Sequence, residues 1–216
     1  MAMIEKEVAQ QISERFKGLK DEVRVWLFTS KDKTQCEYCT EVGQLIRELA
    51  DTNSKIKLFA YDIDEHQKEA KLLGIERVPA VLLHGASKAY GIYYYGMPTG
   101  YEFGSLIEDI ISVSSSESGL LPKSRDAIKK IDKDVDIKVF VTPSCPYCPK
   151  AVLTAHRLAL ENPKIKASMI EATEFMELSE KYGVMGVPKV VINGSTSFEG
   201  AIPEEAFIAY IQRAIG

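Results

Sequence analysis

The 216-residue chain lacks long apolar runs, a basic leader and an excess of positive charge, which leaves the composition of an ordinary globular protein. It has no apolar run near the roughly 20 residues that a membrane-spanning helix needs, so no membrane partner is expected. Its first residues, 1–7, contain no basic region followed by an apolar run, which argues against a signal peptide and predicts a cytoplasmic protein. A net charge of −4 gives no reason to expect nucleic acid as a partner.

Cysteine and the side-chain amides are also scarce. All four cysteines belong to two C-x-x-C pairs, Cys36–Cys39 and Cys145–Cys148. A secreted disulfide scaffold usually scatters its cysteines to join distant segments, so a purely structural role is the weaker interpretation. Three Asn and six Gln stand against 27% charged residues, a composition that indicates a heat-adapted source.

The second cysteine pair follows an apolar run, residues 137–141, and precedes Pro149. This arrangement predicts a strand that leads into a helix. A helix that starts there directs its free backbone N–H groups and positive dipole end at the first sulfur, which stabilises thiolate over thiol. Thiolate is the nucleophile of disulfide exchange, and Pro149 suits a first helical turn. The stretch therefore predicts a dithiol/disulfide redox site.

The same pattern occurs twice with one spacing. Cys36 and Cys145 are 109 residues apart (145 − 36 = 109), and so are Pro79 and Pro188 in two Val-Pro pairs. Chance matches would not preserve one register across cysteines and prolines. The chain is therefore an internal duplication, with about one ordinary domain length in each copy.

Hydrophobic periodicity predicts the same order of elements in both copies: helix, strand, helix, strand, helix, two strands in a hairpin, helix. The Ser-rich stretch 114–119 is the natural boundary, which predicts units of residues 1–116 and 117–216. The predicted fold class is α/β, with a central mixed four-stranded sheet flanked by helices in each unit.

Residues 61–80 and 171–189 resemble the second strand, helix and cis-proline turn of the thioredoxin fold. Cys145-Pro146-Tyr147-Cys148 is similar to the active-site tetrapeptide of glutaredoxins. Two such units in a chain of this length closely resemble the protein disulfide oxidoreductases of hyperthermophiles, also called glutaredoxin-like proteins. The resemblance implies two tandem thioredoxin-like units that catalyse thiol–disulfide exchange on protein disulfides.

The resemblance also implies a catalytic set and a substrate-binding set. The first cysteine of each pair would be the exposed attacking thiol and the second the resolving thiol, with no cofactor besides these redox disulfides: Cys36, Cys39, Cys145 and Cys148. Substrate would contact the two Val-Pro turns, whose prolines would be cis and lie against the sulfurs, and the tyrosine of each motif: Val78, Pro79, Val187, Pro188, Tyr38 and Tyr147.

The two copies differ at the cysteine motif. Position 37 is Glu where position 146 is Pro, and a carboxylate beside the sulfur raises the pKa of Cys36 relative to Cys145. The loop before Cys36, residues 30–35, is also longer than its counterpart, although its two lysines are available to offset the charge of Glu37. The second site is therefore expected to contribute most of the activity.

Zinc is the strongest alternative for a doubled C-x-x-C, because four thiolates complete a tetrahedral site. The matched strand-to-helix contexts in two separate copies favour redox chemistry instead, so no metal is expected. None of the three histidines is duplicated, so solvated or partly buried roles are expected for them. Asp62 and Glu171, again 109 residues apart, are candidate buried acids, but solvation at a strand end is the commoner explanation.

The alternative function is an electron-relay module that passes reducing equivalents from a flavoprotein reductase to a peroxidase or another partner. It rests on a resemblance to the tandem-fold N-terminal part of bacterial alkyl hydroperoxide reductase flavin subunits. Two intact cysteine pairs favour the exchange enzyme, because a relay needs only one. The expected partners are protein disulfide substrates and a thioredoxin-reductase-like flavoprotein donor.

Overall fold

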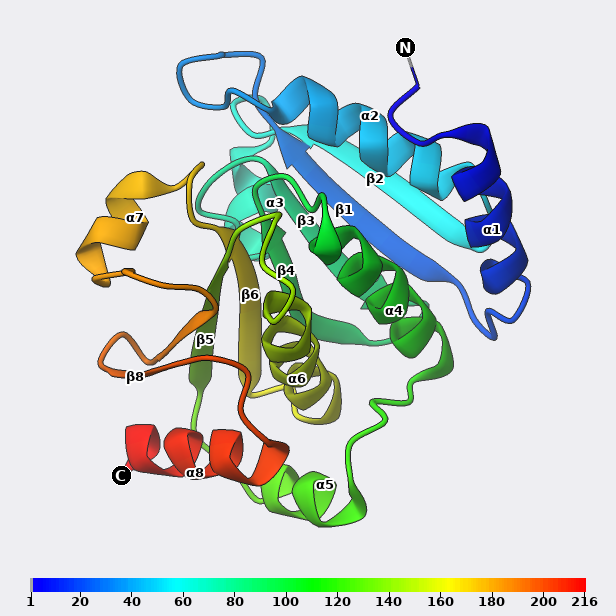
Figure 1. The fold of residues 1–216 in the computed structure, drawn as a ribbon. Coiled ribbons are helices and arrows are strands. Elements are labelled where there is room, and N and C mark those ends of the chain that lie inside the picture. The colour runs from blue at the N-terminus through cyan, green and yellow to red at the C-terminus, as the bar shows by residue number, and fades with distance from the viewer. Residues whose placement is uncertain (1) are drawn as a thin grey trace.

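The computed structural model describes residues 2–216 and places its eight strands in one sheet, in the order β2-β1-β3-β4-β6-β5-β7-β8 (Figure 1). The first unit supplies β1 (Val23–Thr29), β2 (Ile56–Asp62), β3 (Ala80–Gly85) and β4 (Ala89–Tyr95). The second unit supplies β5 (Val135–Val141), β6 (Ile165–Glu171), β7 (Lys189–Ile192) and β8 (Thr196–Glu199). The fold class and the repeated element order predicted from the sequence are confirmed.

Helices pack on both faces of this sheet (Figure 1). One face carries the larger core and six helices: α1 (Lys6–Phe16), α2 (Cys39–Ala50), α4 (Tyr101–Ser115), α5 (Pro122–Lys129), α6 (Cys148–Glu161) and α8 (Glu204–Ile215). The other face carries a smaller core and two short helices, α3 (Gln67–Leu72) and α7 (Met176–Lys181). Both cores contain residues of both units, so the duplicated halves share one interior.

The two four-stranded halves join edge to edge, a relationship that the sequence did not predict. Strand β4 pairs in parallel with β6, from Ile92 opposite Ala167 to Tyr95 opposite Ile170. Pairing satisfies backbone N–H and C=O groups that two separate sheets would leave at exposed edges. Gly91 permits the approach, because a Cβ there would lie 2.9 Å from the Cα of Lys166 and still closer to the carbonyl oxygen before it.

The Ser-rich stretch chosen as the unit boundary is partly helical. Helix α4 runs through Ser115, and its residue Ser114 is buried and bonded to Asp21, just before β1. Its hydroxyl donates to the carbonyl oxygen of Asp21 at 2.7 Å, and its carbonyl accepts the Asp21 N–H at 3.2 Å. The proposed division into residues 1–116 and 117–216 stays a prediction.

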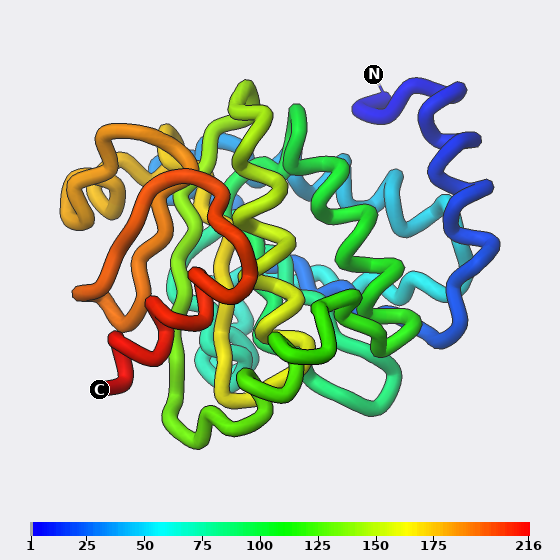
Figure 2. The backbone as a smooth tube through the Cα atoms, turned by 60° about the horizontal axis from the view of Figure 1, so that its bottom comes forward, coloured from blue at the N-terminus to red at the C-terminus, as the bar shows by residue number. Residues whose placement is uncertain are grey.

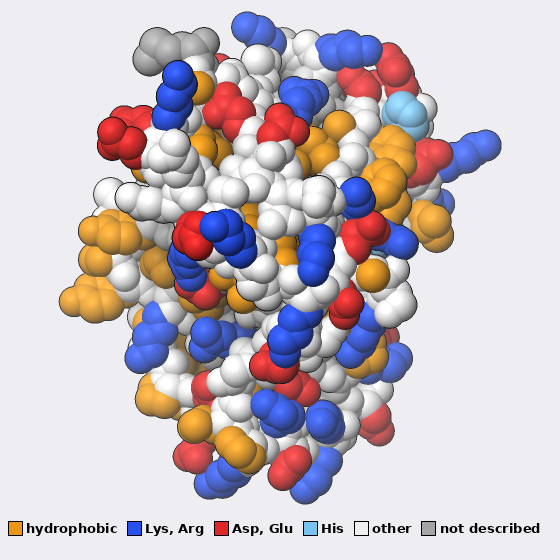
Figure 3. Space-filling view, turned by 90° about the vertical axis from the view of Figure 1, so that its right-hand side faces the viewer, with side chains coloured by type: hydrophobic (Ala, Val, Ile, Leu, Met, Phe, Trp, Pro, Cys, Tyr) orange, Lys and Arg blue, Asp and Glu red, His pale blue; other side chains and the backbone are white. Residues whose placement is uncertain are grey.

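Strands β1 and β5 point in the same direction, so the cysteine motifs that follow them lie at the same edge of the sheet. Four strand spacings separate the two strands, which corresponds to about 19 Å. The two chain ends lie at opposite ends of the molecule in both backbone views (Figures 1 and 2). On the face shown in Figure 3, acidic and basic side chains are interspersed. Within residues 2–216, none of the helices has the length and apolar character that crossing a membrane requires.

Candidate active sites

The second cysteine pair occupies the turn between β5 and α6. Cys145 and Cys148 form a disulfide with their Cα atoms 5.5 Å apart, and α6 begins at Cys148. The backbone N–H of Cys148 donates to the Cys145 sulfur at 3.2 Å. The carbonyl oxygen of Val187, which precedes the cis Pro188, lies 3.6 Å from the same sulfur. A helix start and a cis-proline turn therefore meet at Cys145, an arrangement that the family resemblance implied.

The first pair has the same frame with different contacts. Cys36 and Cys39 form a disulfide with the same 5.5 Å Cα separation, α2 begins at Cys39, and the Val78–Pro79 bond is cis. Here the sulfur that accepts a backbone hydrogen bond is that of Cys39, from the N–H of Ser30 at 3.2 Å. A backbone N–H therefore donates to the second cysteine of this motif, whereas in the other motif a backbone N–H donates to the first.

Cysteine exposure corrects one expectation. In the disulfide form all four cysteines are buried, and Cys36 and Cys39 are equally so, at 5% each. The longer loop 30–35 folds into a turn before this site, in which the Cys36 N–H donates to the Asp32 carbonyl. In the second site the expected order holds, with Cys145 at 8% and Cys148 at 0%.

The tyrosine of the second motif is more exposed than that of the first, as is the first cysteine of that motif. The Tyr147 side chain is 70% exposed, whereas that of Tyr38 is 39% exposed. The surface around the motif tyrosine is therefore more open at the second site.

Lys31, one of the two lysines of the first loop, does not compensate Glu37. Lys31 extends to the strand end instead, with its ammonium 2.6 Å from Glu65 and 3.8 Å from Asp62. These two carboxylates, Glu65 first, raise the pKa of Lys31. The charge difference between the two motifs predicted from Glu37 and Pro146 is therefore not cancelled by this lysine.

Glu171, set aside as a solvated strand end, is 2% exposed. One carboxylate oxygen accepts bonds from the Thr173 hydroxyl at 2.7 Å and the Glu174 N–H at 2.6 Å. Its other oxygen is buried without a hydrogen-bond partner among residues 2–216. The 109-residue relation to Asp62 had marked this position, but the sequence could not show that β6 lies at the centre of the joined sheet.

A second buried polar group lies between the units and was missed. Asp109 of α4 accepts a hydrogen bond from the Tyr94 hydroxyl and pairs with His156 of α6. Two turns earlier on α4, Glu102 is 1% exposed, and burial raises its pKa to about 7. Its neighbour Tyr101 donates its N–H to the carbonyl of Pro143, two residues before Cys145, so this end of α4 borders the second site.

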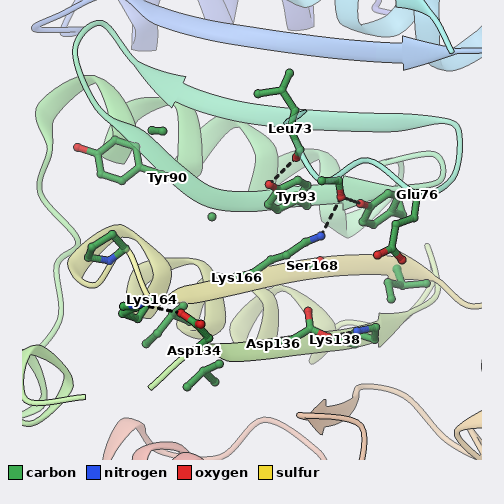
Figure 4. Close-up of a pocket in the computed structure, with 18 of the residues that line it drawn as sticks. Leu73, Glu76, Tyr90, Tyr93, Asp134, Asp136, Lys138, Lys164, Lys166 and Ser168 are labelled. Carbon is green, nitrogen blue, oxygen red and sulfur yellow. Dashed lines mark hydrogen bonds and ion pairs between the residues drawn. The ribbon is translucent and has the colours of Figure 1, made fainter. Parts of the chain in front are cut away.

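A cavity of about 810 Å³ lies on the other face of the sheet, along the seam between β4 and β6 (Figure 4). Lys166 extends from β6 toward the turn after α3, donating to the Gly74 carbonyl at 3.0 Å, and its ammonium lies 4.4 Å from the Tyr93 ring. Burial lowers the pKa of Lys166. None of the residues that line this cavity is a cysteine, so it is separate from both redox sites.

A shared zinc site is incompatible with the geometry. Zinc needs its four ligands within about 2.3 Å, whereas the two cysteine pairs follow strands about 19 Å apart. Among residues 2–216, no cluster of three His, Cys, Asp or Glu side chains is arranged to hold a metal ion.

The fold and the two motifs define a dithiol/disulfide protein of the thioredoxin fold, and a family model described as "Thioredoxin domain" matches residues 135–212. The chain is similar to a protein disulfide oxidoreductase from Aeropyrum pernix K1, with 33% identity and a TM-score of 0.91, over 97% of this chain and 93% of that one. The chain belongs to the protein disulfide oxidoreductase family, whose members are thiol–disulfide oxidoreductases.

Two further relatives come from a different group. The N-terminal domain of alkyl hydroperoxide reductase AhpF from Enterococcus faecalis V583 shares 29% identity with a TM-score of 0.88, over 96% of this chain and 99% of that one. The F component of alkyl hydroperoxide reductase in Staphylococcus aureus strain NCTC 8325 is 28% identical over 89% of this chain and 34% of its own length. The chain spans about a third of the length of the curated relatives it matches.

Proposed function

We propose that the protein reduces, oxidises or isomerises disulfides of other proteins through both cysteine pairs. The environment of the Cys145 sulfur carries this proposal. This sulfur accepts the first free N–H of α6 and lies beside the Val187 carbonyl. Tyr147 of the same motif is exposed. A backbone donor at this sulfur stabilises its thiolate once the disulfide is reduced.

In the reducing direction, the Cys145 thiolate attacks one sulfur of a substrate disulfide. The substrate S–S bond breaks, one substrate thiolate leaves, and a mixed disulfide forms. The Cys148 thiolate then attacks the Cys145 sulfur, releasing the second substrate thiolate and forming the Cys145–Cys148 disulfide. The substrate gains two electrons and the site loses two; oxidation is the same sequence in reverse. Cys36 and Cys39 take the same roles at the first site.

The substrate-binding roles extend this proposal. The Val78 and Val187 backbones, beside Pro79 and Pro188, would pair with an extended substrate segment, and the motif tyrosines would flank it. Trapping tests the assignment of attacker. Cys148→Ser, in a protein without the first pair, should accumulate a mixed disulfide through Cys145. Equal trapping by Cys145→Ser would reverse the roles.

Two assays test the activity itself. With dithiothreitol as donor, the protein should accelerate insulin reduction, and it should reactivate scrambled ribonuclease. The variant with all four cysteines changed to Ser is the control and should be inactive in both. If the wild-type protein performs no better than this variant, protein disulfides are not its substrates.

The similarity to AhpF N-terminal domains supports a second candidate, an electron-relay module. In that role a thioredoxin-reductase-like flavoprotein would reduce one pair, and the electrons would pass to a peroxidase or another partner. Reduction of the protein by NADPH and a purified thioredoxin reductase, without activity on insulin, would favour the relay. Activity on insulin with the same donor would favour the disulfide oxidoreductase. The composition supports placing either function in the cytoplasm of a heat-adapted organism.

A further inference from the structure

The second unit contributes a short segment, residues 172–175, to the surroundings of the first cysteine pair. Glu174 accepts the backbone N–H of Met97 at 2.6 Å. The next residue, Phe175, packs edge-on against Tyr95 with ring centroids 6.4 Å apart, and the Arg77 guanidinium lies 5.9 Å from the centre of the same ring. The segment therefore touches both the end of β4 and the turn that carries Pro79.

One backbone hydrogen bond connects the end of β4, which these residues contact, to the cis-proline turn of the first site. The N–H of Gly96, beside Met97, donates to the carbonyl of Pro79 at 3.1 Å. A Cβ at Gly96 would lie 3.0 Å from the Glu174 carboxylate oxygen, so this carboxylate lies directly against the strand that supports the cis-proline turn.

The charges around this segment are mainly negative. Burial raises the pKa of Glu174 to about 7, the Met97 N–H lowers it, and the carboxylates of Glu171 and Glu37 raise it further. The pKa of the Tyr38 hydroxyl is raised chiefly by Glu37, with smaller contributions from burial and from the two glutamates of the second unit. Glu37 and Tyr38 follow Cys36 directly, so the Glu174 carboxylate acts on the residues beside the sulfur.

We propose that Glu174, a residue of the second unit, is a positioning residue that controls how readily Cys36 becomes a thiolate, with Glu37 and Glu171 completing a group of three carboxylates around the first site. The inference rests on the proposed thiol–disulfide exchange and adds a control by one unit over the other. Three negative charges disfavour a fourth on the Cys36 sulfur. Because Glu174 titrates near neutral pH, its effect grows as the pH rises through that range.

The Pro188 turn of the second site has no equivalent of the Glu174 contact, because the joined sheet is asymmetric. Gly200 donates to the Pro188 carbonyl at 2.8 Å, matching the bond from Gly96 to Pro79. Beyond β8, however, the sheet ends, so no strand of a further unit brings a carboxylate there in the part of the chain that the structure describes. Glu65, the counterpart of Glu174 at the same 109-residue offset, lies at the opposite edge and pairs with Lys31.

This asymmetry gives the two pairs different equilibria. Stabilising the thiolate favours the reduced form of a pair, and destabilising it favours the disulfide. In contact with one external dithiol, the first pair therefore stays more oxidised than the second. Two electrons therefore pass more readily from a reduced first pair to an oxidised second pair than in the opposite direction. The spacing of about 19 Å means that a mobile dithiol carrier or a second copy of the chain mediates any exchange between the pairs.

The test is the pH dependence of Cys36 alkylation by iodoacetamide. The reduced Cys145→Ser/Cys148→Ser protein serves as the background, so that only the first pair reacts. Glu174→Gln should lower the apparent pKa of Cys36 and raise its alkylation rate at pH 8 by roughly threefold, the size expected for loss of one nearby charge. Glu174→Asp, which keeps the charge, should retain most of the original profile.

Two controls separate this effect from general perturbation. Glu177→Gln, on the exposed first turn of α7, should leave Cys36 unchanged. In the Cys36→Ser/Cys39→Ser background, Glu174→Gln should leave Cys145 alkylation unchanged. An unchanged Cys36 profile in folded Glu174→Gln, or equal shifts at both sites, overturns the proposal. Alkylation does not depend on insulin turnover, so failure of the proposed function leaves this result interpretable. If Glu174→Gln does not fold, Glu174→Ala replaces it under the same criterion.

Discussion

The Nδ1 atom of His156, on a helix of the second unit, lies 2.5 Å from the carboxylate of Asp109, on a helix of the first. Both side chains are buried, at 0% and 2% exposure, and Asp109 also accepts a hydrogen bond from Tyr94. Polar groups so deep in a protein are costly unless they are paired. This buried hydrogen-bond network therefore joins α4 of the first unit to α6 of the second.

Removing Asp109 should destabilise the whole chain. Asp109→Ala leaves the Tyr94 hydroxyl and His156 without their partner, so we expect a loss of about 3–5 kcal/mol in the free energy of unfolding. Urea denaturation at pH 7 measures it. Glu108→Ala, which removes an exposed ion pair to Arg15, should cost less than about 1 kcal/mol. Similar losses in the two variants would show that the buried network does not stabilise the junction.

Glu102 should make stability fall as the pH rises. Its pKa is raised by burial to about 7 in the folded protein, against an ordinary value of 4.5. Below pH 4.5 both states hold the proton; between pH 4.5 and 7 the unfolded chain releases it first, so folding stability declines. The full decline attributable to this group is about 3 kcal/mol.

Glu102→Gln, which cannot ionise, should flatten this decline and be the more stable protein at pH 8. Urea denaturation at pH 4, 6 and 8 checks it. Glu174 titrates in the same range and remains in both proteins, so the difference between them isolates Glu102. Glu7→Gln, at an exposed position, is the control. An identical pH dependence with and without the Glu102 carboxyl would contradict the prediction.

The seam between the units should not tolerate a side chain at Gly91. Gly91→Val forces atoms against the backbone of residues 165–166, where neither strand can move without breaking the β4–β6 ladder. We expect a loss of about 1–3 kcal/mol or more in unfolding free energy, measured by urea denaturation. Gly104→Ala, on α4 with no described neighbour within 4 Å, should be neutral or stabilising by about 0.5–1 kcal/mol. If Gly91→Val unfolds like the wild type, the two halves do not pair this closely.

The second site should contribute most of the insulin-reducing activity. The Glu37 carboxylate beside Cys36 disfavours its thiolate, and the greater nucleophilicity of a more basic thiolate offsets only part of that penalty. Cys145→Ser/Cys148→Ser should therefore lose more than two thirds of the turnover, and Cys36→Ser/Cys39→Ser less than a third. Equal losses, or the reverse order, would mean that local charge does not set the rates.

The turns before the two cis prolines should give the sites different substrate preferences. Met185 is 93% exposed two residues before Val187, and its counterpart at the 109-residue offset is Glu76. A large exposed apolar side chain there favours contact with unfolded, apolar polypeptide. In a protein lacking the first pair, Met185→Glu should reduce kcat/KM for insulin about fivefold, as expected for losing about 1 kcal/mol of contact.

Leu72→Glu is the matched control for that experiment. Leu72 is a similarly exposed apolar residue, at 86%, but it lies on α3 in the other unit. It should leave kcat/KM unchanged. A comparable loss in both variants would indicate a general effect of surface charge instead of a substrate contact at the turn.

The sequence by itself determined the duplication, the element order and both cysteine motifs. Period-two and helical patterns act locally, and one 109-residue register relates the two cysteine motifs and the two Val-Pro pairs. The cis state of Pro79 and Pro188 followed from the family resemblance, the helix starts at Cys39 and Cys148 followed from the strand-to-helix pattern, and both are confirmed. These features depend on short stretches of chain, which is why they were readable without the structure.

The tertiary structure alone decided what lies between the halves. Nothing in a strand's own pattern states which edge it pairs with, so the β4–β6 ladder that merges two sheets was not predictable. That ladder moved Glu171 from an expected strand end in solvent to a buried position, and it placed Glu174 beside the first site. It also buried His156 against Asp109. Long-range strand pairing sets which side chains are buried and which charges lie close together, and neither property can be read from the local pattern of one strand.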